Sequence, residues 1–531
     1  MEFNNELITT SEYENLNFNS SIRGSYSTLQ FVIRLHKDVR HHLDQDEITP
    51  EKLQAFSTFL HETIHWWQHI GSHFGFILNT SYPSFAASSF EHLKTLISKD
   101  LAYKSLVKFE ENYFNEKGFC DIEELNIIVN NFYDLDYAKL FCLDNKNIKD
   151  IVKDKRLFLS IGHCFMIMWS NSMFTISETL DKDFNFIPKF NDWIGKFQEL
   201  ESKKIEGFYP DSNYRVSPLG IKAIFEGQAI FNQILYLKNA FAENKIIFKD
   251  FIDQGMLHGI YLEAFDLYLQ IIKEDRPFFV DDALIGLFLL VCDISINPNN
   301  GFPLDIYDYE NFINKNNPGL RFIKICEIIS GQKGYYLERC KHLDKQSYID
   351  LSKLLNKRLG CKCSYQTLEM FKTWANEESV KSLLKEEEKH IYEEINMPFR
   401  LFFAKYLRFQ LDKFEQPEVF CWIGHHMSRA KDASIKHLFD KHRALFIDAE
   451  DGEVKPVIFD GIEEKNLLAT FNKFYQHTMF YELILKWISE EGNFKFDYKW
   501  LLNERNEDAI PRIKQEFNRL FKIDIENIKI V

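Results

Sequence analysis

The chain has 531 residues and a mass of 63.2 kDa, enough for two or three domains. Its net charge of -15 and its pI near 5.7 disfavour nonspecific binding to nucleic acid or to anionic membranes, so we expect neither as a partner. The sequence shows no secretory signal, no apolar run of about 18 residues and no regular cysteine framework, which together predict a cytoplasmic protein with reduced thiols.

The first elements in chain order are a polar segment and a strand. Residues 1–28 are rich in Asn and Ser, so we expect an irregular N-terminal segment. Residues 29–36 alternate apolar and polar side chains, which is typical of a strand.

The segment from Ile48 to Gly71 predicts one amphipathic helix. Thr49 is a suitable N-cap, Pro50 fits the first turn without losing a hydrogen bond, and Gly71 is a suitable C-terminal stop. Large apolar residues recur at three- and four-residue steps, which predicts one core-facing stripe: Leu53, Phe56, Leu60, Ile64 and Trp67. After this helix, residues 74–84 predict a loop or a short strand, and residues 85–106 predict a helix.

His61, Glu62 and His65 form the pattern His-Glu-x-x-His on the predicted helix. Histidines four residues apart lie on one face, so the two imidazoles can bind a single zinc ion. The intervening carboxylate can take the proton of a metal-bound water as a general base. A pair of ordinary structural histidines is the alternative interpretation.

At these residues the chain resembles the zincin metallopeptidases. The resemblance implies that His61 and His65 are zinc ligands and that Glu62 is the general base. A strand just before the metal helix is also similar to the zincin layout, in which a sheet edge receives the peptide. The chain departs from the longer pattern of one zincin branch, because Gln68 and Gly71 stand where that branch has a glycine and a third histidine.

Two later apolar helices contain further candidate residues. Residues 158–169 are apolar on all sides and predict a buried helix that contains His163. Residues 217–236 predict another helix, and Glu226 is the carboxylate in its apolar middle, where an unpaired charge is costly. Here the chain is similar to zincins of the gluzincin type, which take a third ligand, Glu, from a second helix. The resemblance implies Glu226 as that ligand.

The sequence leaves alternatives open for these roles. Glu226 could instead pair with a Lys or Arg or face solvent, and Glu91, His163 and Glu178 are then the other third-ligand candidates. A tetrahedral intermediate also needs a partner for its oxyanion. Tyr214 and His163 are the candidates for that role.

The C-terminal part predicts helices and one small hairpin. Breaker-rich segments at 297–303 and 316–319 bracket a weakly patterned stretch, which indicates a domain boundary or a long surface connection. A substrate-covering loop is the alternative interpretation. Residues 377–394 are charge-rich and predict a solvated face, so Glu387 and His390 make a coincidental Glu-x-x-His pair and a di-iron bundle is disfavoured. Residues 443–447 and 455–459 flank Asp451-Gly452, which predicts a hairpin.

We therefore expect a predominantly α fold with minor β (α+β), built from three parts. These are a polar segment at 1–28, a zincin-like catalytic domain at 29–300, and a mostly helical region at 301–531 with a hairpin near 443–460. The predicted function is intracellular, Zn²⁺-dependent hydrolysis of a protein or peptide substrate. A regulated or defence-type protease is one form of this hypothesis, in which the C-terminal half binds a regulatory protein. The alternative is a non-catalytic binding or scaffold protein with a structural or relic metal site.

Overall fold

Helix α2 (Pro50–Gly71) lies at the centre of the fold and has the boundaries that its capping residues predict. The Thr49 hydroxyl accepts the Lys52 N–H at 3.1 Å, and Pro50 occupies the first turn. Ser72 ends α2 in an extended conformation, and its hydroxyl accepts the Gly75 N–H at 2.9 Å, which starts the next helix at once.

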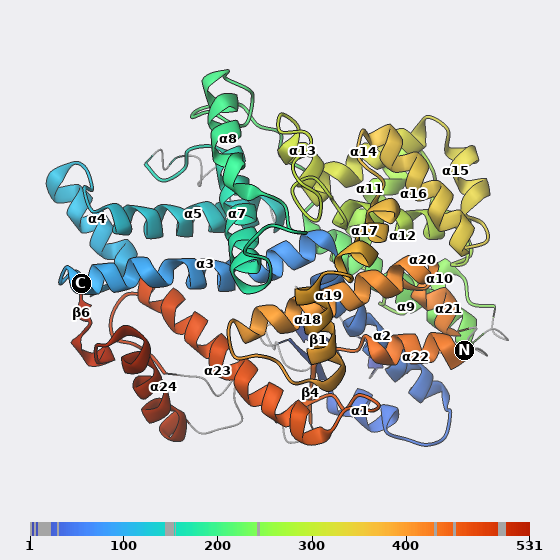
Figure 1. Cartoon of the computed structure of the whole chain (residues 1–531). Helices are drawn as coiled ribbons and strands as arrows, with labels where there is room; N and C mark the ends of the chain where they lie inside the picture. Colours follow the sequence, from blue (N-terminus) through green and yellow to red (C-terminus); the bar gives the residue numbers. More distant parts are fainter. Residues whose placement is uncertain are drawn as a thin grey trace.

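The computed structural model describes residues 3–4, 7–8, 23–28, 31–143, 153, 156–241, 245–428, 433–449, 453–496 and 506–531. Over these residues the fold is predominantly helical with minor β, as the sequence predicts (Figure 1). The strands are β1 (Gly24–Ser27), β2 (Val32–Leu35), β3 (Tyr103–Lys104), β4 (Phe446–Asp448), β5 (Val454–Pro456) and β6 (Lys529–Ile530).

The helices fall into two series along the chain. The first series is α1 (Lys37–Leu43), α2, α3 (His73–Ser98), α4 (Leu106–Lys117), α5 (Glu123–Leu143), α7 (Ile161–Leu180), η2 (Phe190–Asp192), α8 (Trp193–Ser202), α9 (Ile221–Ala240), α10 (Phe248–Asp253), α11 (Ile260–Ile272) and α12 (Ala283–Ile296). The second series is α13 (Phe312–Asn316), α14 (Pro318–Ser330), α15 (Lys333–Cys340), α16 (Lys345–Leu359), α17 (Ser364–Trp374), α18 (Glu378–Lys389), α19 (Met397–Glu415), α20 (Pro417–Cys421), α21 (Ile423–Ser428), α22 (Ala433–Lys441), α23 (Glu464–Ser489), α24 (Asn506–Phe521) and η3 (Ile525–Asn527).

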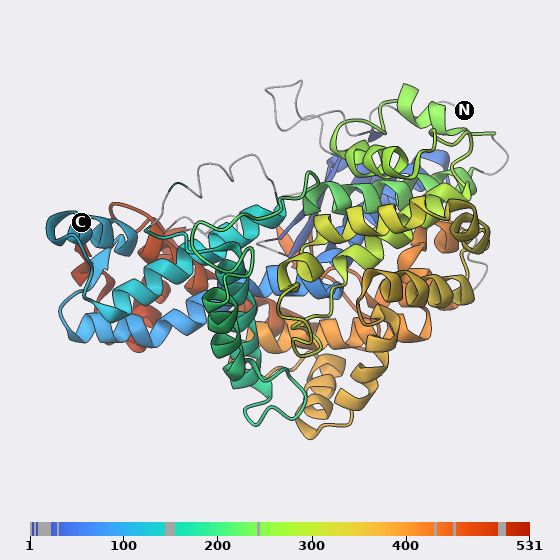
Figure 2. The ribbon, with the colours of Figure 1, turned by 90° about the horizontal axis from the view of Figure 1, so that it is seen from above.

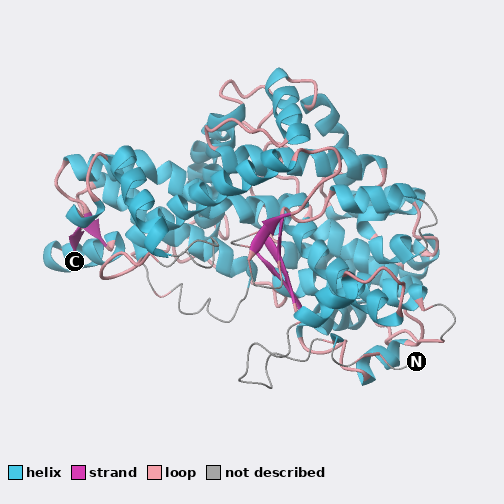
Figure 3. Cartoon of the chain, turned by 90° about the horizontal axis from the view of Figure 1, so that it is seen from below, coloured by secondary structure: helices cyan, strands magenta, loops and turns pink. Residues whose placement is uncertain are grey.

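One small sheet joins the beginning of the chain to its last quarter, in the order β1-β2-β4-β5 (Figure 3). Strands β1 and β2 pair antiparallel, β2 and β4 pair parallel through Val32 and Phe446, and β4 and β5 form the antiparallel hairpin that the sequence predicts. The Asp451-Gly452 turn of that hairpin lies outside the described residues, as do the first two residues of the strand predicted at 29–36. The sheet therefore contains strands from both sides of position 300, where the sequence analysis places a boundary between two parts of the chain.

Helices α3, α4 and α5 extend together with α23 and α24 to one side of the molecule, where the C terminus lies (Figure 1, Figure 2). The buried apolar side chains of the described residues nevertheless form one continuous cluster, which includes residues from both sides of position 300. Among the helices that the structure describes, none has the length and apolar character needed to cross a membrane.

Four local expectations were wrong. Residues 297–303 are buried and do not form a surface connection, because Asn297 accepts the His73 N–H and Asn299 donates to the Lys362 carbonyl. Residues 74–84 are helical, because Ser72 caps α3 and this long helix accommodates Pro83 in its interior. The segment 1–28 is not wholly irregular, since it contains β1, and Phe3, Leu7 and Ile8 are buried. Glu387 and His390 are buried rather than solvated, because α19 packs on α18 and supplies cationic partners.

Candidate metal centre

Helices α2 and α9 bring the candidate ligands together. His61 and His65 lie on α2, and Glu226 lies on α9. Aromatic packing holds the two helices in register, with the rings of Phe56 and Tyr236 5.2 Å apart between centroids. The side chain of Gln68 adds a polar link, because it donates from α2 to α9.

The three donor atoms of this group form a small triangle. The Nε2 atoms of His61 and His65 are 3.0 Å apart, and Oε2 of Glu226 lies 3.3 Å from the first and 3.2 Å from the second. A tetrahedral zinc ion with bonds of about 2.0–2.1 Å holds its ligand atoms about 3.3 Å from one another. The triangle therefore has the dimensions of three corners of a zinc tetrahedron. In the described part of the chain, no other group of three or more His, Cys, Asp or Glu residues comes so close together.

The electrostatics of the group favour a bound cation. Burial raises the pKa of Glu226, but the neighbouring His65 and His61 outweigh this and hold the pKa well below its usual range. Burial lowers the pKa of His65, and here the Glu226 carboxylate outweighs burial and raises the pKa to about 9. The carboxylate thus creates a negative potential at His65 that favours a positive charge there, and a zinc ion would bind by displacing the proton.

Gln68 fixes the orientation of His65. Its Oε1 atom lies 2.8 Å from Nδ1 of His65, which leaves Nε2 free to act as a metal ligand. The Gln68 amide in turn donates to the Phe225 carbonyl at 2.8 Å and to Oε1 of Gln228 at 3.0 Å, both on α9. One side chain therefore orients a ligand and ties its helix to the helix that carries Glu226.

Glu62 points into the same cavity as the histidines and lies against β1. A Cβ atom added to Gly24 of β1 would lie 2.8 Å from Oε1 of Glu62, so the strand approaches this carboxylate closely. Burial raises the pKa of Glu62, although His61 and His65 oppose the shift. A carboxylate with a raised pKa is suited to accept a proton near neutral pH.

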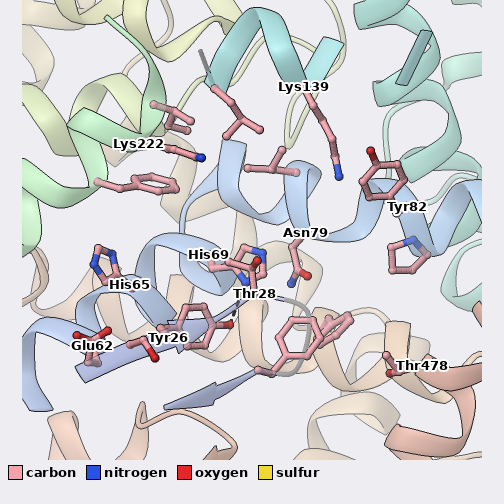
Figure 4. A pocket seen from close by; sticks show the side chains of 18 of the residues that line it. Tyr26, Thr28, Glu62, His65, His69, Asn79, Tyr82, Lys139, Lys222 and Thr478 are labelled. Atoms are coloured by element: carbon pink, nitrogen blue, oxygen red, sulfur yellow. Dashed lines mark hydrogen bonds between the residues drawn. The ribbon is translucent and has the colours of Figure 1, made fainter. Parts of the chain in front are cut away.

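The candidate ligands open into a cavity of about 550 Å³, a volume typical of ligand-binding sites. Its walls come from β1 and from α2, α3, α5, α9, α11, α19 and α23. Figure 4 shows Glu62 and His65 at one end of the cavity, with Tyr82 and Lys139 towards the other. The group therefore faces a space large enough for a substrate, which a closed structural metal site does not have.

The remaining candidates lie outside the cavity. His163 is half-buried, and its Nε2 pairs with Oδ2 of Asp134 at 3.2 Å, so it has a side-chain partner away from the cavity. Tyr214 packs edge-on against Phe141 at 5.5 Å between centroids and lines a separate surface pocket. The structure therefore does not place either side chain where it could stabilise an oxyanion over the histidine pair.

The two other acidic candidates also lie elsewhere. Glu91 pairs with Lys94 at 3.0 Å, and Glu178 pairs with Lys182 at 3.6 Å. Sequence reasoning missed the supporting role of Gln68, although its position three residues after His65 places both on one helix face.

Comparisons of the chain with protein-family models, with curated proteins and with solved structures give no match.

Proposed function

We propose that this protein is a zinc-dependent hydrolase of peptide bonds. The observation that carries the proposal is the triangle formed by His61, His65 and Glu226, with the Glu62 carboxylate beside it in one cavity. Three protein ligands leave one corner of a tetrahedron open towards that cavity. This arrangement favours a catalytic site over the structural or relic metal site of a scaffold protein.

Each residue of the group has a separate task in this proposal. His61, His65 and Glu226 would hold the ion, which, when bound, acidifies a water and polarises the carbonyl of the scissile bond. Glu62 accepts the proton of the attacking water and then gives it to the departing amine, so the water's hydroxyl ends on the acyl product. The burial of Glu62 supports this shuttle, because it raises the pKa of the carboxyl group towards that of the amine.

The test compares Glu62→Gln with the unaltered chain. We expect stoichiometric zinc in both proteins, as measured by elemental analysis, and loss of peptide hydrolysis only in the variant. Glu91→Gln is a matched control, because it changes an exposed glutamate on α3 that pairs with Lys94. His65→Ala should lose the zinc itself.

Two outcomes would overturn the proposal. One is a zinc-free protein after purification without chelator and after incubation with Zn²⁺. The other is full hydrolytic activity in Glu62→Gln. New termini in a cell extract treated with the unaltered chain, and missing with the variant, would identify substrates.

A further inference from the structure

The end of the cavity away from Glu62 contains polar side chains that the proposed hydrolysis does not use. Lys139 of α5 and Asn79 and Tyr82 of α3 line this end. Figure 4 shows the Lys139 ammonium and the Asn79 amide directed into the space. They are the donors of a second site within the same cavity.

Lys139 lacks an anionic partner in the described part of the chain. Its Nζ atom lies over the ring of Tyr82, 3.2 Å from the centroid. The nearby carboxylate of Asp136 accepts the Tyr82 hydroxyl at 3.0 Å, and no described residue forms an ion pair with Lys139. Burial lowers the pKa of Lys139 to about 7, and Asp136 opposes this shift only in part. A half-buried cation without an ion-pair partner is stabilised by an anion that enters the cavity.

Asn79 offers a second unused donor. Its side chain is 7% exposed, and its Nδ2 atom has no hydrogen-bond partner among the described residues. Asn79 and Tyr82 are three residues apart on α3, so they face the cavity on the same side of the helix. An unpaired buried amide destabilises the fold, and an acceptor on a ligand would satisfy it.

The rest of the cavity surface is mainly apolar. Its apolar residues include Phe31, Leu78, Ile221, Phe225, Phe402 and Leu485. A ligand that spans the cavity therefore needs an apolar middle, a carbonyl at the Glu62 end and an anion at the Lys139 end. A short apolar peptide with a free C terminus has all three features.

We propose that Lys139 and Asn79 bind the terminal carboxylate of a peptide whose scissile bond lies beside Glu62. This inference rests on the proposed function, and it makes the protein an exopeptidase that acts near the C termini of apolar peptides. Lys139 supplies the charge, and the amide of Asn79 supplies a directed N–H. A carboxylate on an Asp or Glu side chain has the same chemistry, so the experiment must separate the two sources.

The experiment measures peptide binding by calorimetry, and every chain compared, the otherwise unaltered one included, carries Glu62→Gln so that the probes are not hydrolysed during the titration. The probes are an apolar tetrapeptide with a free C terminus, its C-terminal amide, and an amidated tetrapeptide with one internal Asp. We expect the unaltered chain, with zinc bound, to prefer the free acid over the simple amide by about 10- to 100-fold, as a charge-assisted hydrogen bond provides. In Lys139→Met the preference should fall to about one, whereas Lys139→Arg should retain it in part.

Lys94→Met is the matched control, because Lys94 also lies over an aromatic ring, that of Phe90, but on the outer part of α3. It should keep the preference of the unaltered chain. Equal binding of acid and amide by the unaltered chain, or an unchanged preference in Lys139→Met, would overturn the inference. Tight binding of the Asp peptide alone would overturn the assignment to the C terminus. Because the binding measurement is made on chains that carry Glu62→Gln, a failure of hydrolysis would remain distinguishable from a failure of this subsite.

Discussion

Replacing Gln68 by Leu should weaken zinc binding although Gln68 is not itself a candidate ligand. The substitution keeps a buried side chain of similar size and removes both ends of the amide. His65 then loses the acceptor 2.8 Å from its Nδ1 atom, and α2 loses its donors to Phe225 and Gln228 on α9. The imidazole can rotate or take the other tautomer, which places a hydrogen on the Nε2 atom that faces Glu226.

The size of the effect follows from these contacts. Loss of a hydrogen-bond partner that orients a metal-binding histidine costs about 10- to 100-fold in metal affinity, which equals about 1.4 to 2.7 kcal/mol at 25 °C. The buried N–H and carbonyl groups left without partners cost about 1–3 kcal/mol of folding free energy. If Gln68 had only a structural role, the variant would lose folding free energy without losing zinc affinity.

Gln410→Leu provides the matched control. Gln410 is buried, and its amide donates to the Gly71 carbonyl at 2.7 Å, so it also ties a helix to α2. Both variants should lose stability in urea unfolding of the zinc-free chains. Only Gln68→Leu should lose zinc affinity in a competition titration with a chromophoric chelator. Affinities of the two variants within about twofold of each other would refute the reasoning.

Two further predictions concern β1 and the α18–α19 contact. Gly24→Ala should lower kcat/KM at least about tenfold while the zinc content stays unchanged. The new Cβ would lie 2.8 Å from Oε1 of Glu62 and would displace that carboxylate. Normal activity in the variant would show that the strand can shift instead. Burial raises the pKa of Glu387, but Lys405 and Arg408 outweigh it and lower the pKa from 4.5 to about 2. The ionised Glu387 therefore stabilises the fold fully above pH 4.5, and this stabilisation is lost as the pH falls towards 2. Glu387→Gln should lower the free energy of unfolding by about 3 kcal/mol at neutral pH. In the variant, the free energy of unfolding in urea should also fall less steeply as the pH is lowered. An equally steep fall in the variant would contradict this.

The residues of the candidate metal group could be predicted from the sequence because each of the signals that point to them is local. Thr49 and Pro50 define the start of α2, and the four-residue spacing of His61 and His65 fixes their common face. Glu226 was singled out by the cost of a charge in an apolar helix and by the resemblance to gluzincins, and in the structure the two imidazoles lie within 3.3 Å of its carboxylate and compensate that cost.

The features that the sequence did not reveal depend on contacts between distant segments. Strand β1 is short and half-buried, and its four residues, Gly-Ser-Tyr-Ser, have no alternating apolar pattern. Its place in the sheet depends on β2, which pairs on its other side with β4 more than 400 residues later along the chain. The same reason explains Glu387, whose charge run looks solvated until α19 supplies Lys405 and Arg408. Nothing near Lys139 in sequence indicates that α5 packs beside α3 and α7.

Helices of the C-terminal half form part of the cavity wall. Phe402 of α19 lies 4.6 Å from Phe31 between ring centroids, and Phe31 stacks on His69, one turn beyond His65 on α2. Helix α23 adds Tyr481 and Leu485 to the same walls. Residues after position 300 therefore complete the space in front of the candidate ligands, so a partner that moved α19 or α23 would alter ligand binding directly. If this half has a regulatory role, its movements can act on the candidate metal group directly, because its helices already form one side of the cavity.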